Sequence, residues 1–294
     1  MLRRELELDG PLVVGDFGGG GPPLLMVHGI GGAKINWMLL APLLADRFHV
    51  EALDLPGFGE SPLAGRSAAL DSQRNLVVRY IQEVVGSPVV LTGHSMGGLI
   101  SMLVASARPD LVERLVLFDP AFPPRTRSPA PGVPTMALNL MSRAPRLFAP
   151  VGSALTLLRG PRSTVERALA NSSAPSSTLP AAFVEAHVEA ETARLHGATP
   201  YLGYLQAWRW FGEAYEEPST LEAMATGISA PTLLIHGELD RVVSPDAARR
   251  LGELQPGWSV RMMAGIGHNP NFEAPEVSAQ WIFEWLAGGS HTAG

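Results

Sequence analysis

The stretch that decides the fold is Gly93-His94-Ser95-Met96-Gly97, which lies between the apolar run 89–91 and a small-residue segment, 99–107. A strand, then Gly-x-Ser-x-Gly, then a helix places a serine on a sharp turn with its hydroxyl exposed. The two glycines prevent a collision of this turn with its neighbours. We therefore interpret Ser95 as a nucleophile and the Met96 amide, at the helix start, as an oxyanion donor. The alternative is a glycine-rich loop without chemistry.

A serine hydroxyl needs an adjacent base, and a carboxylate that orients the base. His268 follows the last predicted strand on a glycine-flanked loop, and Asp240 follows the strand before it. The carboxyl ends of parallel strands meet at one edge of a sheet, so these residues can converge with Ser95. We predict Asp240 as the acid, with Asp119, which also follows a strand, and Glu238 as alternatives.

A second oxyanion donor is expected after the apolar run 24–27, where the chain reads His28-Gly-Ile-Gly-Gly32. Glycines here let the backbone approach a ligand closely. We assign the Ile30 amide to this role, with Gly31 as the alternative. Gly29 and His94 are expected at the substrate pocket.

Two polar residues near these loops are interpreted as structural. His28 is expected to brace the glycine-rich loop. Asp54 opens the turn-rich loop 54–61, where we expect its carboxylate to make hydrogen bonds within the loop.

Composition limits the classes of function. The 294 residues carry a net charge of −6, which argues against nucleic acid as a partner, and no cysteine, which excludes disulfides and thiolate metal sites. No apolar run is long enough to span a bilayer, and the charged N-terminus is unlike a signal peptide. No metal-ligand spacing, P-loop or dinucleotide motif is present. We expect no cofactor, no metal, a small-molecule partner and a cytoplasmic location; the oligomeric state is not predicted.

The order of patterns predicts a core with an insertion. Buried strands are expected near 24–27, 48–53, 89–91, 115–118, 231–235 and 260–263, after a hairpin over 5–17. Between 121 and 226 the pattern is helical and rich in proline at its start. We predict a core from residues 1–120 and 227–294 and a helical cap from residues 121–226.

The predicted cap has two features. Its aromatic residues from Tyr201 to Tyr215 recur at steps of three and four, which indicates one helical stripe. From this stripe Trp208 and Phe211, together with Met136, are predicted to reach the pocket. The segment 121–184 holds seven arginines and one acid, whereas acids dominate the later half. We favour pairing between the halves, with an anion- or membrane-facing basic patch as the alternative.

Together the motifs at 28–32, 54–61, 93–98, 237–240 and 267–270 resemble the α/β-hydrolase superfamily. The resemblance covers about residues 5–120 and 227–287. It implies an α/β fold with a mostly parallel, doubly wound sheet. It also implies a Ser95–His268–Asp240 triad and a hydrolytic reaction without a cofactor.

The resemblance leaves the substrate open. Serine at position 95, where dehalogenases and epoxide hydrolases of this fold carry aspartate, argues against those activities. We predict a carboxylesterase for apolar acyl chains of short to medium length. The alternatives are a lipase or acylglycerol hydrolase and a C–C bond hydrolase, which Asn269 after the base makes less favoured. A hydrolase-fold receptor that binds without turnover is the non-enzyme alternative.

Overall fold

The computed structural model describes residues 1–125, 133–197 and 201–288. Its centre is an eight-stranded sheet in the order β1-β2-β4-β3-β5-β6-β7-β8. Strands β1 and β2 pair antiparallel, as do β2 and β4, and every other neighbouring pair is parallel. The prediction of an α/β fold with a mostly parallel sheet is confirmed. The strands are β1 (Leu2–Glu7), β2 (Pro11–Gly18), β3 (Pro23–Val27), β4 (His49–Leu53), β5 (Val89–His94), β6 (Val112–Phe118), β7 (Thr232–Gly237) and β8 (Ser259–Met263).

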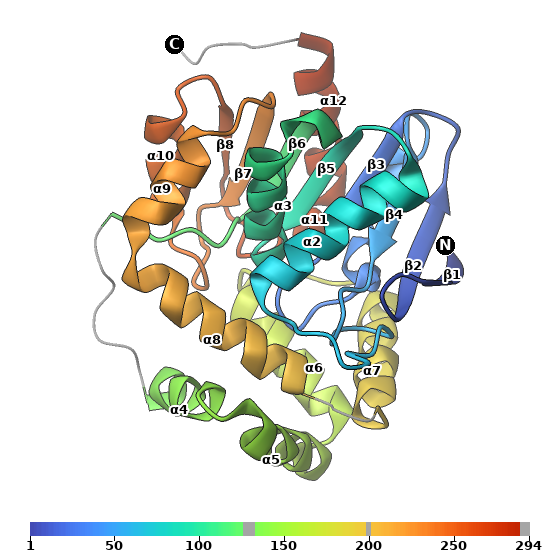
Figure 1. The fold of residues 1–294 in the computed structure, drawn as a ribbon, viewed down its shortest axis with the longest axis vertical. Coiled ribbons are helices and arrows are strands. Elements are labelled where there is room, and N and C mark those ends of the chain that lie inside the picture. The colour runs from blue at the N-terminus through green and yellow to red at the C-terminus, as the bar shows by residue number, and fades with distance from the viewer. Residues whose placement is uncertain (126–132, 198–200, 289–294) are drawn as a thin grey trace.

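Helices cover both faces of the sheet, with α2 and α3 in front of it and α12 behind it in Figure 1. Alternate residues of β3 belong to opposite layers: Leu25 and Val27 join the core under α2 and α3, while Leu24 and Met26 join the core under α1 and α12. This alternation is why the strand reads as a continuous apolar run. The helices of these layers are α1 (Ala41–Leu44), α2 (Leu70–Tyr80), α3 (Met96–Ala107), α10 (Pro245–Leu254), α11 (Pro270–Glu273) and α12 (Pro275–Gly288).

Between β6 and β7 the chain forms a helical segment, which we call the insertion. Its helices α4 to α8 lie beyond the carboxyl ends of the strands, at the bottom of Figure 1, whereas α9 lies beside α10 and packs on α3. Helices α4 and α5 pack on α8, and α6 packs on α7. No described helix of the chain is both long and apolar enough to cross a bilayer. The helices of the insertion are α4 (Val133–Ser142), α5 (Pro145–Arg159), α6 (Pro161–Ser172), α7 (Ala181–Leu195), α8 (Leu202–Glu216) and α9 (Pro218–Thr226).

Helix α3 approaches the sheet so closely that its first turn has room only for glycine. A Cβ atom on Gly97 would lie 2.1 Å from the carbonyl oxygen of Val27, and one on Gly93 would lie 2.3 Å from the carbonyl oxygen of Gly97. Both contacts are with backbone atoms, which cannot turn aside. The glycine requirement inferred from the sequence therefore has a direct steric cause.

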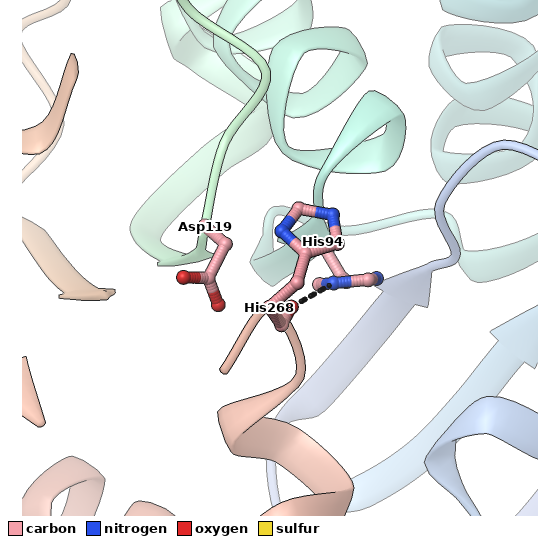
Figure 2. Close-up of side chains that lie close together, drawn as sticks. All are labelled: His94, Asp119 and His268. Atoms are coloured by element: carbon pink, nitrogen blue, oxygen red, sulfur yellow. Dashed lines mark hydrogen bonds between the residues drawn. The ribbon is translucent and has the colours of Figure 1, made fainter. Parts of the chain in front are cut away.

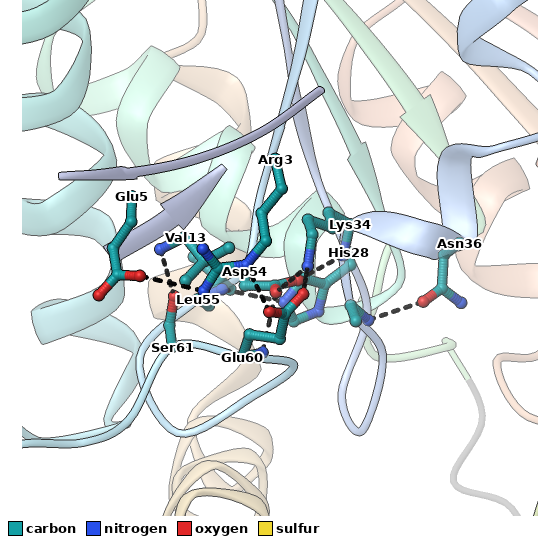
Figure 3. Close-up of polar contacts among 11 residues, drawn as sticks. Arg3, Glu5, Val13, His28, Lys34, Asn36, Asp54, Leu55, Glu60 and Ser61 are labelled. Carbon is teal, nitrogen blue, oxygen red and sulfur yellow. Dashed lines mark hydrogen bonds and ion pairs between the residues drawn. The ribbon is translucent and has the colours of Figure 1, made fainter. Parts of the chain in front are cut away.

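The loop after β3 is held by the loop after β4, as Figure 3 shows. The buried Asp54 carboxylate accepts hydrogen bonds from the Lys34 amide (2.6 Å), from Lys34 Nζ (2.7 Å) and from the Glu60 amide (2.9 Å). His28 donates from Nδ1 to the Gly29 carbonyl oxygen, and its Nε2 accepts from the Leu55 amide. These contacts place His28 and Asp54 in the bracing roles expected from the sequence.

Gly97→Ala should lower the free energy of unfolding by about 2–3 kcal/mol or more, because the added methyl group overlaps backbone of β3. Gly212→Ala is the matched control. It also changes a helical glycine to alanine, but no atom lies within 4 Å of its added Cβ. There we expect stability unchanged or higher by up to about 1 kcal/mol. Urea unfolding of the two variants checks this, and equal stabilities would contradict the steric argument.

Lys34→Met should lower the free energy of unfolding by about 3–5 kcal/mol, because it leaves the buried Asp54 carboxylate without its ammonium partner. Arg79→Met, which breaks the exposed Arg79–Glu83 pair, serves as the control and should change nothing measurable. Thermal and urea unfolding compare the two variants. If both are equally stable, the buried pair does not hold the loop.

Candidate active site

Ser95 lies on the turn between β5 and α3 with φ of 53° and ψ of −115°. A non-glycine residue in this region costs about 1–3 kcal/mol and persists only where the surroundings enforce it. Here its amide donates to the carbonyl oxygen of Phe118, and its carbonyl oxygen accepts from the amides of Leu99 and Ala121. The backbone is thus fixed on both sides, and the side chain is one of the groups that line a cavity.

His268 and Asp240 form a buried pair at the same edge of the sheet. Nδ1 of His268 donates to Oδ2 of Asp240 at 2.7 Å. Oδ1 of Asp240 accepts from the amides of Val242 and Val243. Burial raises the pKa of the Asp240 carboxyl, but hydrogen bonds from His236 and His268 outweigh burial and hold this pKa below its usual range. Asp240 is therefore a carboxylate at neutral pH and fixes the His268 tautomer that carries its proton on Nδ1.

That tautomer leaves Nε2 of His268 as the acceptor. His268 and Ser95 line the same cavity, and within the described residues the Ser95 hydroxyl makes no hydrogen bond. A hydroxyl without another partner can turn toward a nearby acceptor. Of the three residues predicted from the sequence, Ser95 and His268 thus line one cavity, and the third, Asp240, is hydrogen bonded to His268.

His94 contacts His268, as the dashed line in Figure 2 shows. Its Nε2 donates to the carbonyl oxygen of His268 at 2.8 Å, and the two rings lie 4.8 Å apart. Burial and the neighbouring His268 lower the pKa of His94 to about 3, so the ring is neutral at neutral pH. His94 therefore positions the His268 loop and adds no charge beside it.

Asp119, the alternative acid, is fully buried at the end of β6. Its Oδ1 accepts from the Gly237 amide at 2.9 Å and lies 3.4 Å from Nε2 of His236, which in turn lies 3.3 Å from Asp240. Burial and the Asp240 carboxylate hold the pKa of Asp119 well above its usual range. The two carboxyl groups therefore differ in acidity: the pKa of Asp240 lies below the usual range and that of Asp119 lies above it. Sequence analysis did not single out His236, although it stands four residues before Asp240.

The two backbone amides predicted as oxyanion donors are those of Met96 and Ile30. Met96 is the first residue of α3, where helix amides have no partner within the helix. Ile30 lies in the loop that is held by Lys34 and Asp54, and it also lines the cavity. Among the described loop and cap contacts, neither amide donates to another backbone group.

The cavity has a volume of about 400 Å³ and lies between the sheet edge and the insertion. Its wall includes Gly29 and His94, as expected. Among the described residues it does not include the other three residues predicted for the pocket. Met136 is exposed on α4, Trp208 donates from its indole to Asn139, and Phe211 packs on the core. The insertion instead contributes Thr164, Val165, Ala168, Leu169, Ser172, His187, Ala190, Glu191, Arg194, Tyr201 and Tyr204.

One part of this wall is polar. Arg194 donates from Nε to Glu191 at 3.0 Å, and its guanidinium lies 4.0 Å from the centre of the Tyr201 ring. The Tyr201 hydroxyl donates to Glu191 at 2.9 Å. Sequence analysis missed this group. Its only signal is the three-residue spacing of Glu191 and Arg194.

The insertion also makes hydrogen bonds to the loop that carries His268. The His268 amide donates to the carbonyl oxygen of Ser172, at the end of α6, and Asn269 donates to the Ser172 hydroxyl. Glu273 accepts from the amides of Ala174 and Gly267. The position of His268 therefore depends on both the sheet and the insertion.

Three groups of described His, Asp and Glu residues have donor atoms within 4.8 Å of one another. Two of them contain Asp119, one with His94 and His268 and the other with His236 and Asp240. Three of their buried atoms, His94 Nδ1, Asp119 Oδ2 and His236 Nδ1, have no hydrogen-bond partner among the described residues. The third group, Asp16, His49 and Glu51, already has the Arg4 guanidinium as its cation.

A larger hollow of about 560 Å³ lies between α1 and α12. It is lined by Leu43, Arg47 and Phe283, among others, and no serine or histidine reaches it. Of these two cavities, only the one at Ser95 has a serine and histidines in its wall.

Comparisons with known proteins agree with the fold described above. The dihydrolipoyllysine-residue acetyltransferase component of the acetoin cleaving system of Pseudomonas putida is 42% identical over 116 residues, which is 40% of this chain and only 29% of that protein. The pimeloyl-acyl-carrier-protein methyl ester esterase of Aeromonas hydrophila is 27% identical over 92% of this chain and 97% of its own. A solved structure described as a membrane phospholipase A and bacterial virulence factor is 28% identical, with a TM-score of 0.75, over 98% of this chain and 86% of that one.

A family model described as "alpha/beta hydrolase fold" matches residues 22–275. This range contains six parallel strands, the turn at Ser95 and the loops of Asp240 and His268. The resemblance inferred from the motifs is confirmed. The chain belongs to the α/β-hydrolase fold family.

Proposed function

We propose that this protein is a serine hydrolase that cleaves carboxylic esters. The observation that carries the proposal is the strained Ser95 turn at a cavity whose wall also holds His268, which is hydrogen bonded to Asp240. A nucleophile, a base with a fixed tautomer and an ionised acid are the parts that acyl transfer by serine requires.

In the proposed reaction, Ser95 Oγ attacks the acyl carbon while Nε2 of His268 accepts the hydroxyl proton. The amides of Met96 and Ile30 donate to the oxyanion, and each such donor is worth about 2.7–4 kcal/mol in comparable sites. His268 then protonates the leaving alcohol. Water, activated by the same nitrogen, attacks the acyl-enzyme and releases the acid and the free serine.

The substrate we favour has an apolar acyl chain of short to medium length. The support is the size of the cavity, about 400 Å³, and the aliphatic part of its wall from α6, such as Val165 and Leu169. The esterase from Aeromonas hydrophila, by its name, also acts on a methyl ester. We treat residues 121–226 as a cap over the core of residues 1–120 and 227–294, because α6, α7 and α8 supply much of the cavity wall.

A lipase is the second candidate. Its support is the 28% identity, over nearly the whole chain, to the structure described as a phospholipase A. The Arg194–Glu191–Tyr201 group would then face polar parts of a lipid near the ester.

Initial rates on p-nitrophenyl esters from acetate to palmitate test the function. We expect a maximum at short to medium acyl chains, because the cavity is confined. Ser95→Ala should fold normally and lose at least about 10³-fold in kcat, since it removes the nucleophile. A maximum at palmitate would favour the lipase.

Two outcomes would contradict the proposal. Hydrolysis retained by pure Ser95→Ala protein would remove Ser95 from the reaction. A wild-type protein that does not react with a fluorophosphonate probe would lack an activated serine and would point to the receptor alternative.

The two buried acids should differ in their effect on rate. Asp240→Asn should reduce kcat by about 10³–10⁴-fold, because an amide can hold the wrong tautomer of His268. Asp119→Asn should cost less than about tenfold, because Asp119 makes no hydrogen bond to His268 among the described residues, and its raised pKa favours the neutral carboxyl that an amide resembles. Steady-state kinetics on one ester compare the variants, with circular dichroism as the folding control. The reverse order of losses would assign the acid to Asp119.

A further inference from the structure

The outer face of α4 and α5 is unusually apolar. Of the twelve large apolar side chains that are exposed in the described part of the chain, seven lie on these two helices. Leu158 is 84% exposed and Leu147 is 70% exposed, while the other five such residues of the chain are scattered over distant elements. Contiguous apolar surface of this kind marks an interaction site. The seven residues are Met136, Leu140, Leu147, Val151, Leu155, Leu157 and Leu158.

The pattern on α5 is that of a helix at an interface. Leu147, Val151, Leu155 and Leu158 follow one another at steps of four, four and three, so they share one face. The opposite face of α5 is buried, and the helix packs there on α8. Figure 1 places α4 and α5 on the side of α8 that faces away from the sheet, at the lower edge of the molecule. The apolar face is therefore turned outward.

The charge beside this face has one sign. No acidic residue occurs between Asp119 and Glu166 in the sequence. Arg143, Arg146 and Arg159 are exposed at the ends of α4 and α5, and none of them pairs with an acid among the described residues. By contrast, Arg162 pairs with Glu185 on α7. This is a contact of the kind predicted from the sequence, between the basic first half and the acidic second half of the insertion.

We propose that the outer face of α4 and α5 docks on a bilayer that contains anionic phospholipid. The leucines would enter the boundary between headgroups and acyl chains, and the arginines would contact headgroup phosphates. A second copy of the chain fits less well, because two such faces would bring their arginines together. The overall charge of −6 repels an anionic surface, so attraction through this one face would also orient the molecule.

This inference goes beyond the proposed ester hydrolysis and does not depend on it. Docking through α4 and α5 would place the insertion, and the cavity beneath it, on the bilayer side of the molecule. No catalytic group takes part in the contact. Binding and catalysis can therefore be measured separately.

Flotation of the whole chain with vesicles tests the proposal. One set is pure phosphatidylcholine and the other is an equal mixture of phosphatidylcholine and phosphatidylglycerol. We expect binding to the mixed vesicles that weakens as salt rises from about 0.1 M to about 1 M, because the Debye length falls from about 10 Å to about 3 Å. No binding to mixed vesicles, or equal binding to both sets, would overturn the proposal.

Two double variants and matched controls locate the contact. Leu147→Ser/Leu158→Ser should weaken the partition coefficient at least about tenfold, whereas Leu2→Ser/Val277→Ser, also at exposed sites, should not. Arg143→Gln/Arg159→Gln should weaken it roughly fivefold per arginine. Arg74→Gln/Arg108→Gln makes the same change of net charge elsewhere and should have no comparable effect.

Folding of each variant is checked by thermal melting and by its rate on a soluble ester, which should stay at the wild-type value. Equal losses in the controls would overturn the proposal. Sedimentation velocity tests whether a second copy of the chain, and not a bilayer, covers the face. If the wild-type protein is a dimer and Leu147→Ser/Leu158→Ser is a monomer, the face belongs to a dimer interface and the proposal is overturned.

Discussion

The close approach of α3 to the sheet is the constraint on which the rest of the site depends. Backbone of the first turn of α3 lies against the end of β3, with no side chain at Gly93 or Gly97 to hold the two apart. The chain can turn that sharply only by placing Ser95 in a strained conformation. Hydrogen bonds from the Ser95 amide to the Phe118 carbonyl oxygen and from the Ala121 amide to the Ser95 carbonyl oxygen hold it there. The same approach brings the start of α3 beside the loop after β3. Packing thus decides in one step where Ser95 and the amides of Met96 and Ile30 lie.

A second constraint is electrostatic. The carboxyl groups of Asp119 and Asp240 are buried close to each other. Two negative charges so close together in a poorly solvated place cannot both form. Asp240 has two backbone amides and two histidines within reach, whereas Asp119 has one amide and an oxygen, Oδ2, without a partner in the described chain. The negative charge therefore settles on Asp240, on the side that faces His268. The difference in hydrogen bonds, and not the position along the chain, separates an orienting acid from a structural one.

The sequence predicts the core much better than the insertion, and the physical reason is periodicity. Strands buried on both faces are short apolar runs with turns after them, so each strand and the loop after it could be located. The positions of these loops predicted that Ser95, Asp240 and His268 lie at one edge of the sheet. An insertion helix has several partners along its length. The stripe on α8 shows this: Tyr201 and Tyr204 reach the cavity, Trp208 contacts Asn139, and Phe211 packs on the core. Spacing identifies such a stripe but does not say which turn meets which neighbour.

The insertion has two surfaces of different chemistry, one that faces the sheet and one that faces away from it. Toward the sheet, α6 and α7 present a mixed wall in which the Arg194 guanidinium is matched by Glu191, so no net charge is added to the cavity. Away from the sheet, α4 and α5 present leucines and arginines without any acid. Ser172 and Glu273 hydrogen bond the insertion to the His268 loop, so the segment that carries the outer apolar face also helps to hold His268 in place.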